Sequence, residues 1–105
     1  MIRTTITTRH CEIADALRER AELVMARLVT LSDRATEPTV VFDLEAGLHQ
    51  AELRLQTAGG KVLVAAAEGP DHRTALDRAE GKLRRQLVRA VSKTRARRHS
   101  GSTPA

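Results

Sequence analysis

Residues 39–68 read TVVFDLEAGLHQAELRLQTAGGKVLVAAAE, and this stretch decides the fold. Apolar and polar residues alternate along three segments of it, which is typical of strands with one buried side and one wet side. Glycine-containing connections separate the segments and favour tight hairpin turns. The stretch therefore predicts three consecutive antiparallel strands, at 39–45, 49–57 and 61–68. Their wet side would carry Asp43, Glu45, Glu52, Arg54 and Gln56.

The segments on either side of this stretch add one strand and two helices. Alternation of Ile and Thr over 2–8 predicts the first strand. Apolar residues at steps of three and four predict helices near 14–31 and 72–95, and Asp71 is placed to cap the second helix. The order β-α-β-β-β-α predicts an α+β fold, a two-layer sandwich with both helices on one face of a four-stranded sheet. We expect a single domain over 1–98 and a short disordered tail over 99–105.

The composition excludes several classes of protein. The chain has no Trp, no Tyr and a single Phe, Phe42, so modules that stack bases on aromatic side chains are poor candidates. One cysteine, Cys11, excludes an internal disulfide and fits a reducing compartment. No stretch resembles a signal peptide or is apolar for long enough to cross a membrane. We therefore expect a cytoplasmic protein that does not bind membranes.

Basic residues concentrate toward the C-terminal end. Residues 1–80 contain ten Arg and Lys and all thirteen Asp and Glu, whereas 81–105 contain eight Arg and Lys and no acidic residue. A basic end on a slightly acidic body indicates an electrostatic surface for a polyanion such as nucleic acid. The alternative is a solvated basic tail, but the cations begin inside the second predicted helix.

Five cations fall together on that helix. At about 100° per residue they share one exposed edge, opposite the stripe of apolar residues that we expect to be buried. The cations are Arg78, Lys82, Arg85, Arg89 and Lys93. The apolar stripe consists of Leu76, Ala79, Leu83, Leu87, Ala90 and Val91.

The sequence predicts neither a catalytic site nor a metal site. Four scattered histidines and Cys11 lack the spacing of metal ligands, apart from the neighbours His10 and Cys11, whose side chains would point apart on an extended backbone. No pattern of nucleophile and base occurs, and Gly59-Gly60 lacks the rest of a phosphate-binding loop. We therefore expect no enzyme, no cofactor, no metal and no small-molecule substrate.

Several motifs, in their order along the chain, resemble those of the ribosome hibernation-promoting (ribosome-associated inhibitor) family. Thr8-Arg9-His10, followed by Glu12-Ile13 and by DALRE at 15–19, is similar to the entry into the family's first helix. Asp71, ALD at 75–77, and Lys82-Leu83 with Arg85-Gln86-Leu87 are similar to its second helix. Gly59-Gly60 stands where the family has its hairpin glycines, so the resemblance covers 1–98.

The resemblance implies a ribosome hibernation factor of the short type, which inhibits translation, with a fold similar to a double-stranded-RNA-binding domain. Family members bind the small ribosomal subunit in the channel for tRNA and mRNA, and contact its rRNA mainly through basic residues of the helices. The resemblance adds Arg9, His10 and Arg27 to the candidate RNA-binding residues. Leu23 and Val24 stand where many relatives carry lysine, and Arg73 where many carry tyrosine, so the second helix should carry more of the contact.

The residue types indicate how RNA would be recognised. Fifteen of the eighteen basic residues are Arg, whose planar fork matches phosphate oxygens. Without aromatic residues or a base-reading motif, we expect the protein to recognise phosphates and RNA shape. We also expect it to be a monomer away from the ribosome. Two alternatives stay open: a generic double-stranded-RNA-binding module, and a protein-interaction domain that uses the wet face of its sheet.

Overall fold

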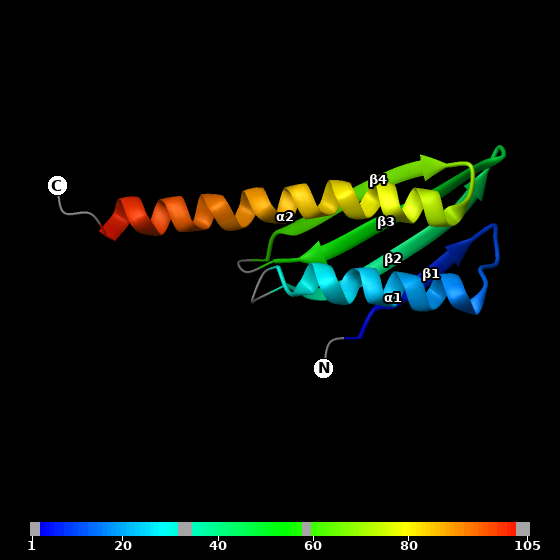
Figure 1. The fold of residues 1–105 in the computed structure, drawn as a ribbon, viewed down its shortest axis with the longest axis horizontal. Helices are drawn as coiled ribbons and strands as arrows, with labels where there is room; N and C mark the ends of the chain where they lie inside the picture. The colour runs from blue at the N-terminus through cyan, green and yellow to red at the C-terminus, as the bar shows by residue number, and fades with distance from the viewer. Residues whose placement is uncertain (1–2, 32–34, 58–59, 103–105) are drawn as a thin grey trace.

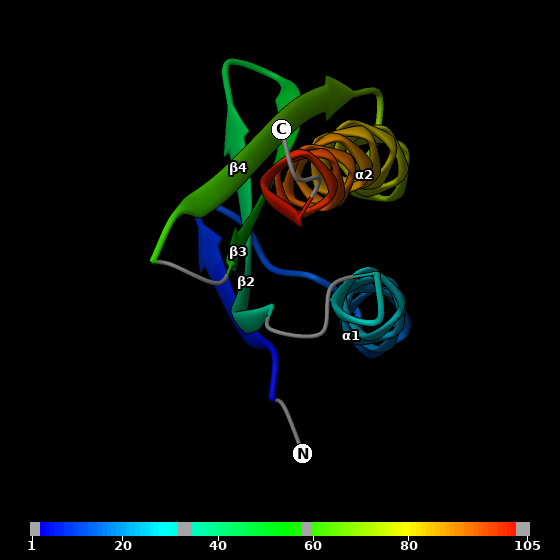
Figure 2. The same ribbon diagram turned by 90° about the vertical axis from the view of Figure 1, so that its left-hand side faces the viewer.

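A computed structural model describes residues 3–31, 35–57 and 60–102, and for 91–102 it describes the backbone alone. The order β-α-β-β-β-α is confirmed. Both helices cover the same face of one sheet, so the predicted two-layer α+β fold is confirmed as well (Figures 1 and 2). The elements are β1 (Thr5–Arg9), α1 (Asp15–Val29), β2 (Thr36–Glu45), β3 (Leu48–Gln56), β4 (Val62–Gly69) and α2 (His72–Ser102).

The sheet has the strand order β1-β2-β3-β4. β1 runs parallel to β2 and the other two pairings are antiparallel, as α1 and the two hairpins require. Ala46 and Gly47 form the two-residue connection from β2 to β3, with φ of 54° and 78°. Two positive φ values in succession suit the right-handed twist of the strands. β1 and β4 are therefore the two edges of the sheet.

One hydrophobic core fills the space between the sheet and the helices. Alternate residues of the strands point into it, so the strand pattern read from the sequence is confirmed. From β2, Val40 and Phe42 are fully buried, and Leu53 and Leu55 of β3 are too. The helices contribute Ala21, Val24, Met25, Leu28, Ala75, Leu76, Ala79, Leu83 and Leu87. Ala90 is partly buried, and the side chain of Val91 lies outside the described residues.

The other face of the sheet is open. The five polar residues predicted there are all partly or largely exposed. Val62 and Val64 of β4 also lie on this side, where they are 52% and 42% exposed. Val41 lies on this face too but is only 9% exposed, because Thr7 and Glu52 flank it in the neighbouring strands.

α2 is longer than the sequence predicts. It begins at His72, as predicted, where the Asp71 carboxylate accepts a hydrogen bond of 2.7 Å from the Thr74 N–H and caps the helix. The helix then continues to Ser102, beyond the predicted end at 95, and projects past the sheet (Figure 1). No proline interrupts 71–103, so the backbone can stay helical after the apolar stripe ends. Residues 99–102, expected in a disordered tail, are thus helical, and 103–105 lie outside the described residues.

Candidate nucleic-acid interface

Three long side chains of α2 reach across to the free edge of β4. Arg78 Nη1 donates to the carbonyl of Glu68 at 2.8 Å, Lys82 Nζ to that of Ala66 at 2.9 Å, and Gln86 Nε2 to that of Val64 at 3.0 Å. The match has a simple geometric cause. Four residues of helix rise about 6 Å and two residues of strand about 6.6 Å, so every fourth helical residue meets every second strand carbonyl.

These contacts correct the predicted placement of the cationic stripe. Because Arg78 and Lys82 reach β4, the stripe lies on the flank of α2 that faces this strand, and not opposite the buried stripe. The partners are neutral carbonyls, so both side chains keep their positive charge. The same bonds occupy edge carbonyls that would otherwise be free to pair with another strand.

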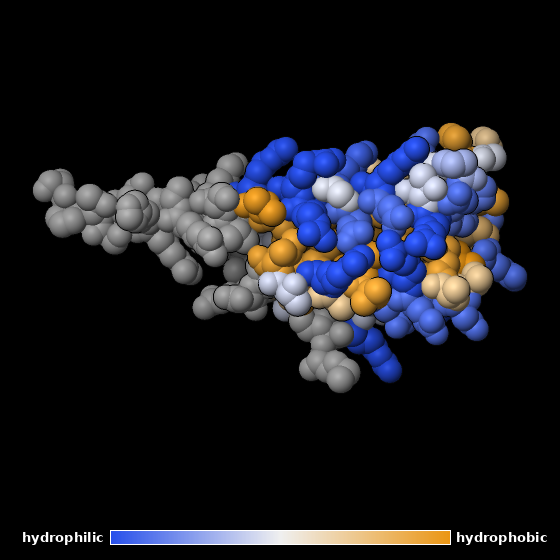
Figure 3. Space-filling view, in the orientation of Figure 1, coloured by the Kyte–Doolittle hydropathy of each residue, from blue (hydrophilic) through white to orange (hydrophobic). Residues whose placement is uncertain are grey.

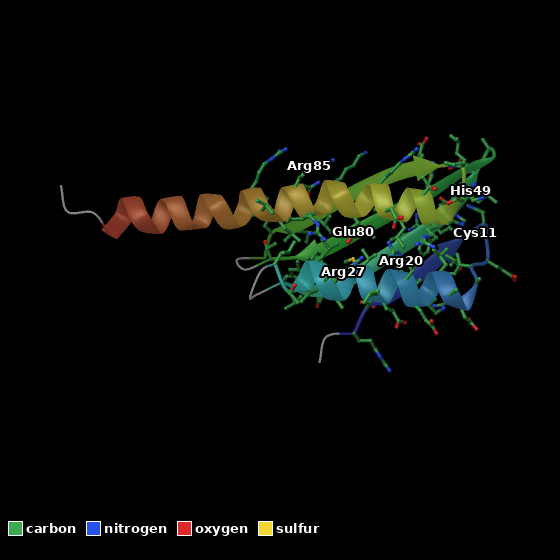
Figure 4. All side chains as sticks on the ribbon, viewed as in Figure 1. Cys11, Arg20, Arg27, His49, Glu80 and Arg85 are labelled. Carbon is green, nitrogen blue, oxygen red and sulfur yellow. The ribbon has the colours of Figure 1, made fainter. Side chains whose placement is uncertain are left out.

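Two further cations of this flank have no partner in the part of the chain that the structure describes. Arg85 and Arg89 are exposed, and neither makes a hydrogen bond or ion pair with any residue that the structure describes. Arg85 extends from the side of α2 away from α1 (Figure 4). Together with Arg78 and Lys82 they form what we call the basic flank. The side chain of Lys93, predicted to continue it, lies outside the described residues.

Shallow hollows accompany the basic flank along the seam between α2 and β4. One is lined by Arg78, Lys82 and Arg85 around Gly81, together with the carboxylates of Glu68 and Asp77. Another is lined by Arg89 and Lys61 beside the apolar start of β4. Hydrophilic side chains dominate the surface over α2 on the helix-bearing face (Figure 3). The seam is thus a grooved surface on which positive charge predominates.

The opposite flank of α2 meets α1 through charged side chains. Arg27 Nη2 of α1 lies 3.3 Å from Glu80 Oε2, and Arg84 Nη2 lies 3.4 Å from the same oxygen. One turn away, Arg20 Nη2 lies 3.2 Å from Asp77 Oδ1. We call these five residues the inter-helix cluster; Arg20, Arg27 and Glu80 are labelled between the helices in Figure 4. Arg27, a candidate RNA contact, is therefore tied to a carboxylate.

Arg9 and His10 come at the end of β1, which is the sheet edge opposite β4. His10 Nδ1 is 3.1 Å from Asp43 Oδ1, and the ring is 75% exposed. The hydrogen bond from His10, helped by the Leu44 N–H and the charge of Arg9, holds the pKa of Asp43 below its ordinary value. Arg9 and Lys82 both line a hollow on the open sheet face, but three carboxylates, of Asp43, Glu52 and Glu68, line it too. This end of the molecule is therefore of mixed charge.

Two other histidines, His49 and His72, pack against each other, and His72 also packs against Phe42 of the core. The rings of His49 and His72 meet edge to face at 4.6 Å, and His72 Nε2 is 2.9 Å from the Asp43 carbonyl oxygen. Within the described part of the chain, no three His, Cys, Asp or Glu side chains are grouped so that they could hold a metal ion. Nor is any helix in that part long and apolar enough to cross a membrane.

Sequence reasoning missed residues on both flanks. Gln86 was not predicted to serve the β4 edge, and Glu80 and Arg84 were not predicted to join the helices. The helical repeat carried part of the signal, since Gln86 stands four residues after Lys82 and Arg84 four after Glu80. Of the two departures in α1, Val24 is fully buried and Leu23 is 52% exposed, so only Leu23 leaves an apolar surface where a cation was expected.

Comparisons with known proteins agree on one family. The family model described as sigma 54 modulation protein / S30EA ribosomal protein matches residues 4–95. The ribosome hibernation promoting factor of Escherichia coli (strain K12) is 36% identical over 88 residues, which cover 84% of this chain and 92% of the relative. That of Azotobacter vinelandii is 33% identical over 104 residues, with coverage of 99% and 95%.

Solved structures give the same result. The N-terminal domain of Thermus thermophilus Protein Y superposes with a TM-score of 0.71 at 31% identity, over 84% of this chain and 96% of that one. A ribosomal subunit interface protein from Coxiella burnetii superposes with a TM-score of 0.77 over 85% and 97%. At 22% identity, the second likeness supports the fold alone.

Proposed function

Because the chain belongs to the sigma 54 modulation protein / S30EA ribosomal protein family, we propose that it is a ribosome hibernation factor that inhibits translation. It does so by occupying the small ribosomal subunit in the channel for tRNA and mRNA. Relatives named ribosome hibernation promoting factor match nearly their whole length and support this role. The motifs at the entry to the first helix and along the second point to the same family.

The basic flank is the observation that carries the proposal. Its four cations share one side of α2, and none of them forms an ion pair with a carboxylate among the described residues. Guanidinium and ammonium groups arranged in this way bind phosphate oxygens of an RNA backbone. Arg85 and Arg89 make the main contacts, Arg78 and Lys82 support them, and Lys93 is a further contact. Arg9, His10 and Arg27 are secondary contacts because each lies at or beside a carboxylate.

The hydrogen bonds to β4 help this binding by ordering the side chains in advance. A free Arg or Lys loses rotational freedom when it binds a phosphate, which costs about 0.5–1.5 kcal/mol per side chain. Arg78 and Lys82 are already held near their place, and each keeps further N–H donors for RNA. The protein would select its site by fitting a folded rRNA surface, because it lacks the aromatic residues that read single-stranded bases.

Co-sedimentation tests the proposal. The purified protein is mixed with isolated small subunits, isolated large subunits or whole ribosomes at near-physiological salt, with an RNA duplex and free rRNA as controls. We expect retention on small subunits and whole ribosomes, displacement by excess tRNA, and inhibition of translation in a purified system. Equal, salt-sensitive binding to every RNA would favour a generic RNA-binding module instead. Binding to none of them would overturn the proposal and point to protein partners of the open sheet face.

A further inference from the structure

The inter-helix cluster holds two arginines on one oxygen atom. Arg27 comes from α1 and Arg84 from α2, and both donate to Glu80 Oε2, at 3.3 Å and 3.4 Å. The Glu80 side chain is 13% exposed, whereas those of Arg27 and Arg84 are 46% and 48% exposed. The carboxylate therefore lies inward, between the helices, and the two guanidinium groups lie outward, toward solvent.

We propose that Glu80 holds Arg27 and Arg84 together as one phosphate-binding pair, which rests on the proposed function of binding rRNA. Each guanidinium has five N–H donors, so a contact to Glu80 leaves others free. Two cations on one anion keep a net positive charge. Since both forks converge on the same oxygen, they lie close enough together to contact a single RNA phosphate. Arg84 is thereby an RNA-binding residue and Glu80 a positioning residue.

The position of the pair on α2 supports this role. Arg84 and Arg85 are neighbours in sequence, so their side chains leave the helix about 100° apart. Arg84 points to the side of α1, where it meets Glu80, and Arg85 lies on the basic flank. A helix that carries cations on both flanks can contact phosphates on either side of it. The pair would thus add a second row of contacts to the one along β4.

Neutralising Glu80 tests the inference, because its effect on net charge and its effect on the position of the arginines change RNA binding in opposite directions. Glu80→Gln raises the net charge by one, so simple electrostatics predicts tighter binding to RNA. If Glu80 positions the arginines, the same change releases them and weakens binding, by about threefold or more. Glu22→Gln is the matched control, because Glu22 is an exposed carboxylate of α1 with no partner among the described residues. It adds the same charge and should leave binding unchanged or slightly tighter.

Two further variants keep the test decisive. Glu80→Asp preserves the net charge but shortens the side chain, so it should also weaken binding. Arg84→Gln should weaken binding in the wild-type background and have a smaller effect in the Glu80→Gln background, since the pair is already lost there. Urea midpoints identify any variant that is unfolded, and Glu80→Asp then replaces Glu80→Gln in the cycle.

Equilibrium binding to isolated small subunits is the measurement. Weaker binding by Glu80→Gln and Glu80→Asp, with Glu22→Gln at or above wild type, is the expected result. Binding by Glu80→Gln as tight as wild type or tighter would overturn the inference and leave Glu80 as a tie between helices. In that case the proposed function still stands, because its own failure would appear as absence of binding by the wild-type protein.

Discussion

The two flanks of α2 both carry basic side chains, but the partners of these side chains differ in charge. On the side of β4, Arg78 and Lys82 bond to backbone carbonyls, and Arg85 and Arg89 have no partner among the described residues. On the side of α1, three arginines meet the carboxylates of Asp77 and Glu80. A carbonyl orders a cation without neutralising it, whereas a carboxylate does both.

The difference shows why counts of basic residues are a poor guide to a nucleic-acid interface. The partner of each cation decides how much charge is left for a polyanion. By that measure the basic flank leaves more positive charge for a polyanion, and the inter-helix cluster mainly positions its arginine side chains. The arginines of these ion pairs are 31–48% exposed. Ion pairs that solvent screens contribute little to folding, about 0–1 kcal/mol each, so the cluster has small weight in stability.

Reversing the charge of the basic flank should have the largest effect on RNA binding. Arg85→Glu combined with Arg89→Glu places two carboxylates against RNA phosphates, and like charges brought together cost several kcal/mol. We expect co-sedimentation with small subunits to be lost at near-physiological salt, and the far-ultraviolet circular dichroism to stay unchanged.

The matched control for that variant is Arg3→Glu with Arg54→Glu. It changes the net charge by the same amount, and Arg54 lies on the open sheet face, paired with Glu52 at 3.0 Å. Retained binding by this control places the interface on α2. Loss of binding in the control and retention in the flank variant would instead favour a partner of the sheet face.

A pair of methionine substitutions separates the two roles of the β4 contacts. Lys82→Met and Gln86→Met each remove one hydrogen bond to a β4 carbonyl, and each should cost about 0.5–1 kcal/mol in the free energy of unfolding. Only Lys82→Met also removes a charge, so it alone should weaken binding several-fold and reduce the salt slope by about one. Urea unfolding and subunit binding, measured on both variants, check this. Equal affinities for the two would mean that Lys82 serves the sheet edge alone.

The smallest effect on binding is expected at the start of α2. Hydrogen bonds from the backbone and hydroxyl of Thr74 hold the pKa of Asp71 below its ordinary value of 3.8. A lowered folded-state pKa stabilises the fold above the unfolded pKa, and that contribution disappears as pH falls through the folded value. Asp71→Asn should therefore lose less stability than wild type between about pH 5 and about pH 3 in urea unfolding. Subunit binding at neutral pH should be the same for both.

Local sequence pattern was sufficient for most of the fold. Alternation in 39–68 and the glycine connections defined the three antiparallel strands because each strand has one buried and one open face. The end of α2 was predicted too early because the apolar stripe stops near Ala90, while the helix continues to Ser102. No proline interrupts 71–103, so the backbone can stay helical beyond the end of the apolar pattern.

The candidate site was only partly predictable. The helical repeat placed Arg78, Lys82, Arg85 and Arg89 on one side of α2, and they do share a flank. Which way that flank faces depends on how α2 lies across β4, and this is a tertiary property. The contacts of Glu80 also depend on tertiary structure. The helical repeat places Glu80 four residues before Arg84, but only the packing of α1 against α2 brings it to Arg27.

The salt dependence of binding to isolated small subunits tests the central claim most directly. If the basic flank and Lys93 together neutralise five phosphates, log K for the wild type should fall with log salt at a slope of about −3 to −5. The slope should become shallower by about 1.5–2 in Arg85→Gln with Arg89→Gln, and should not change in Arg3→Gln with Arg54→Gln. Equal slopes in all three proteins would contradict the account, because the cations of α2 would then release no counterions from the RNA.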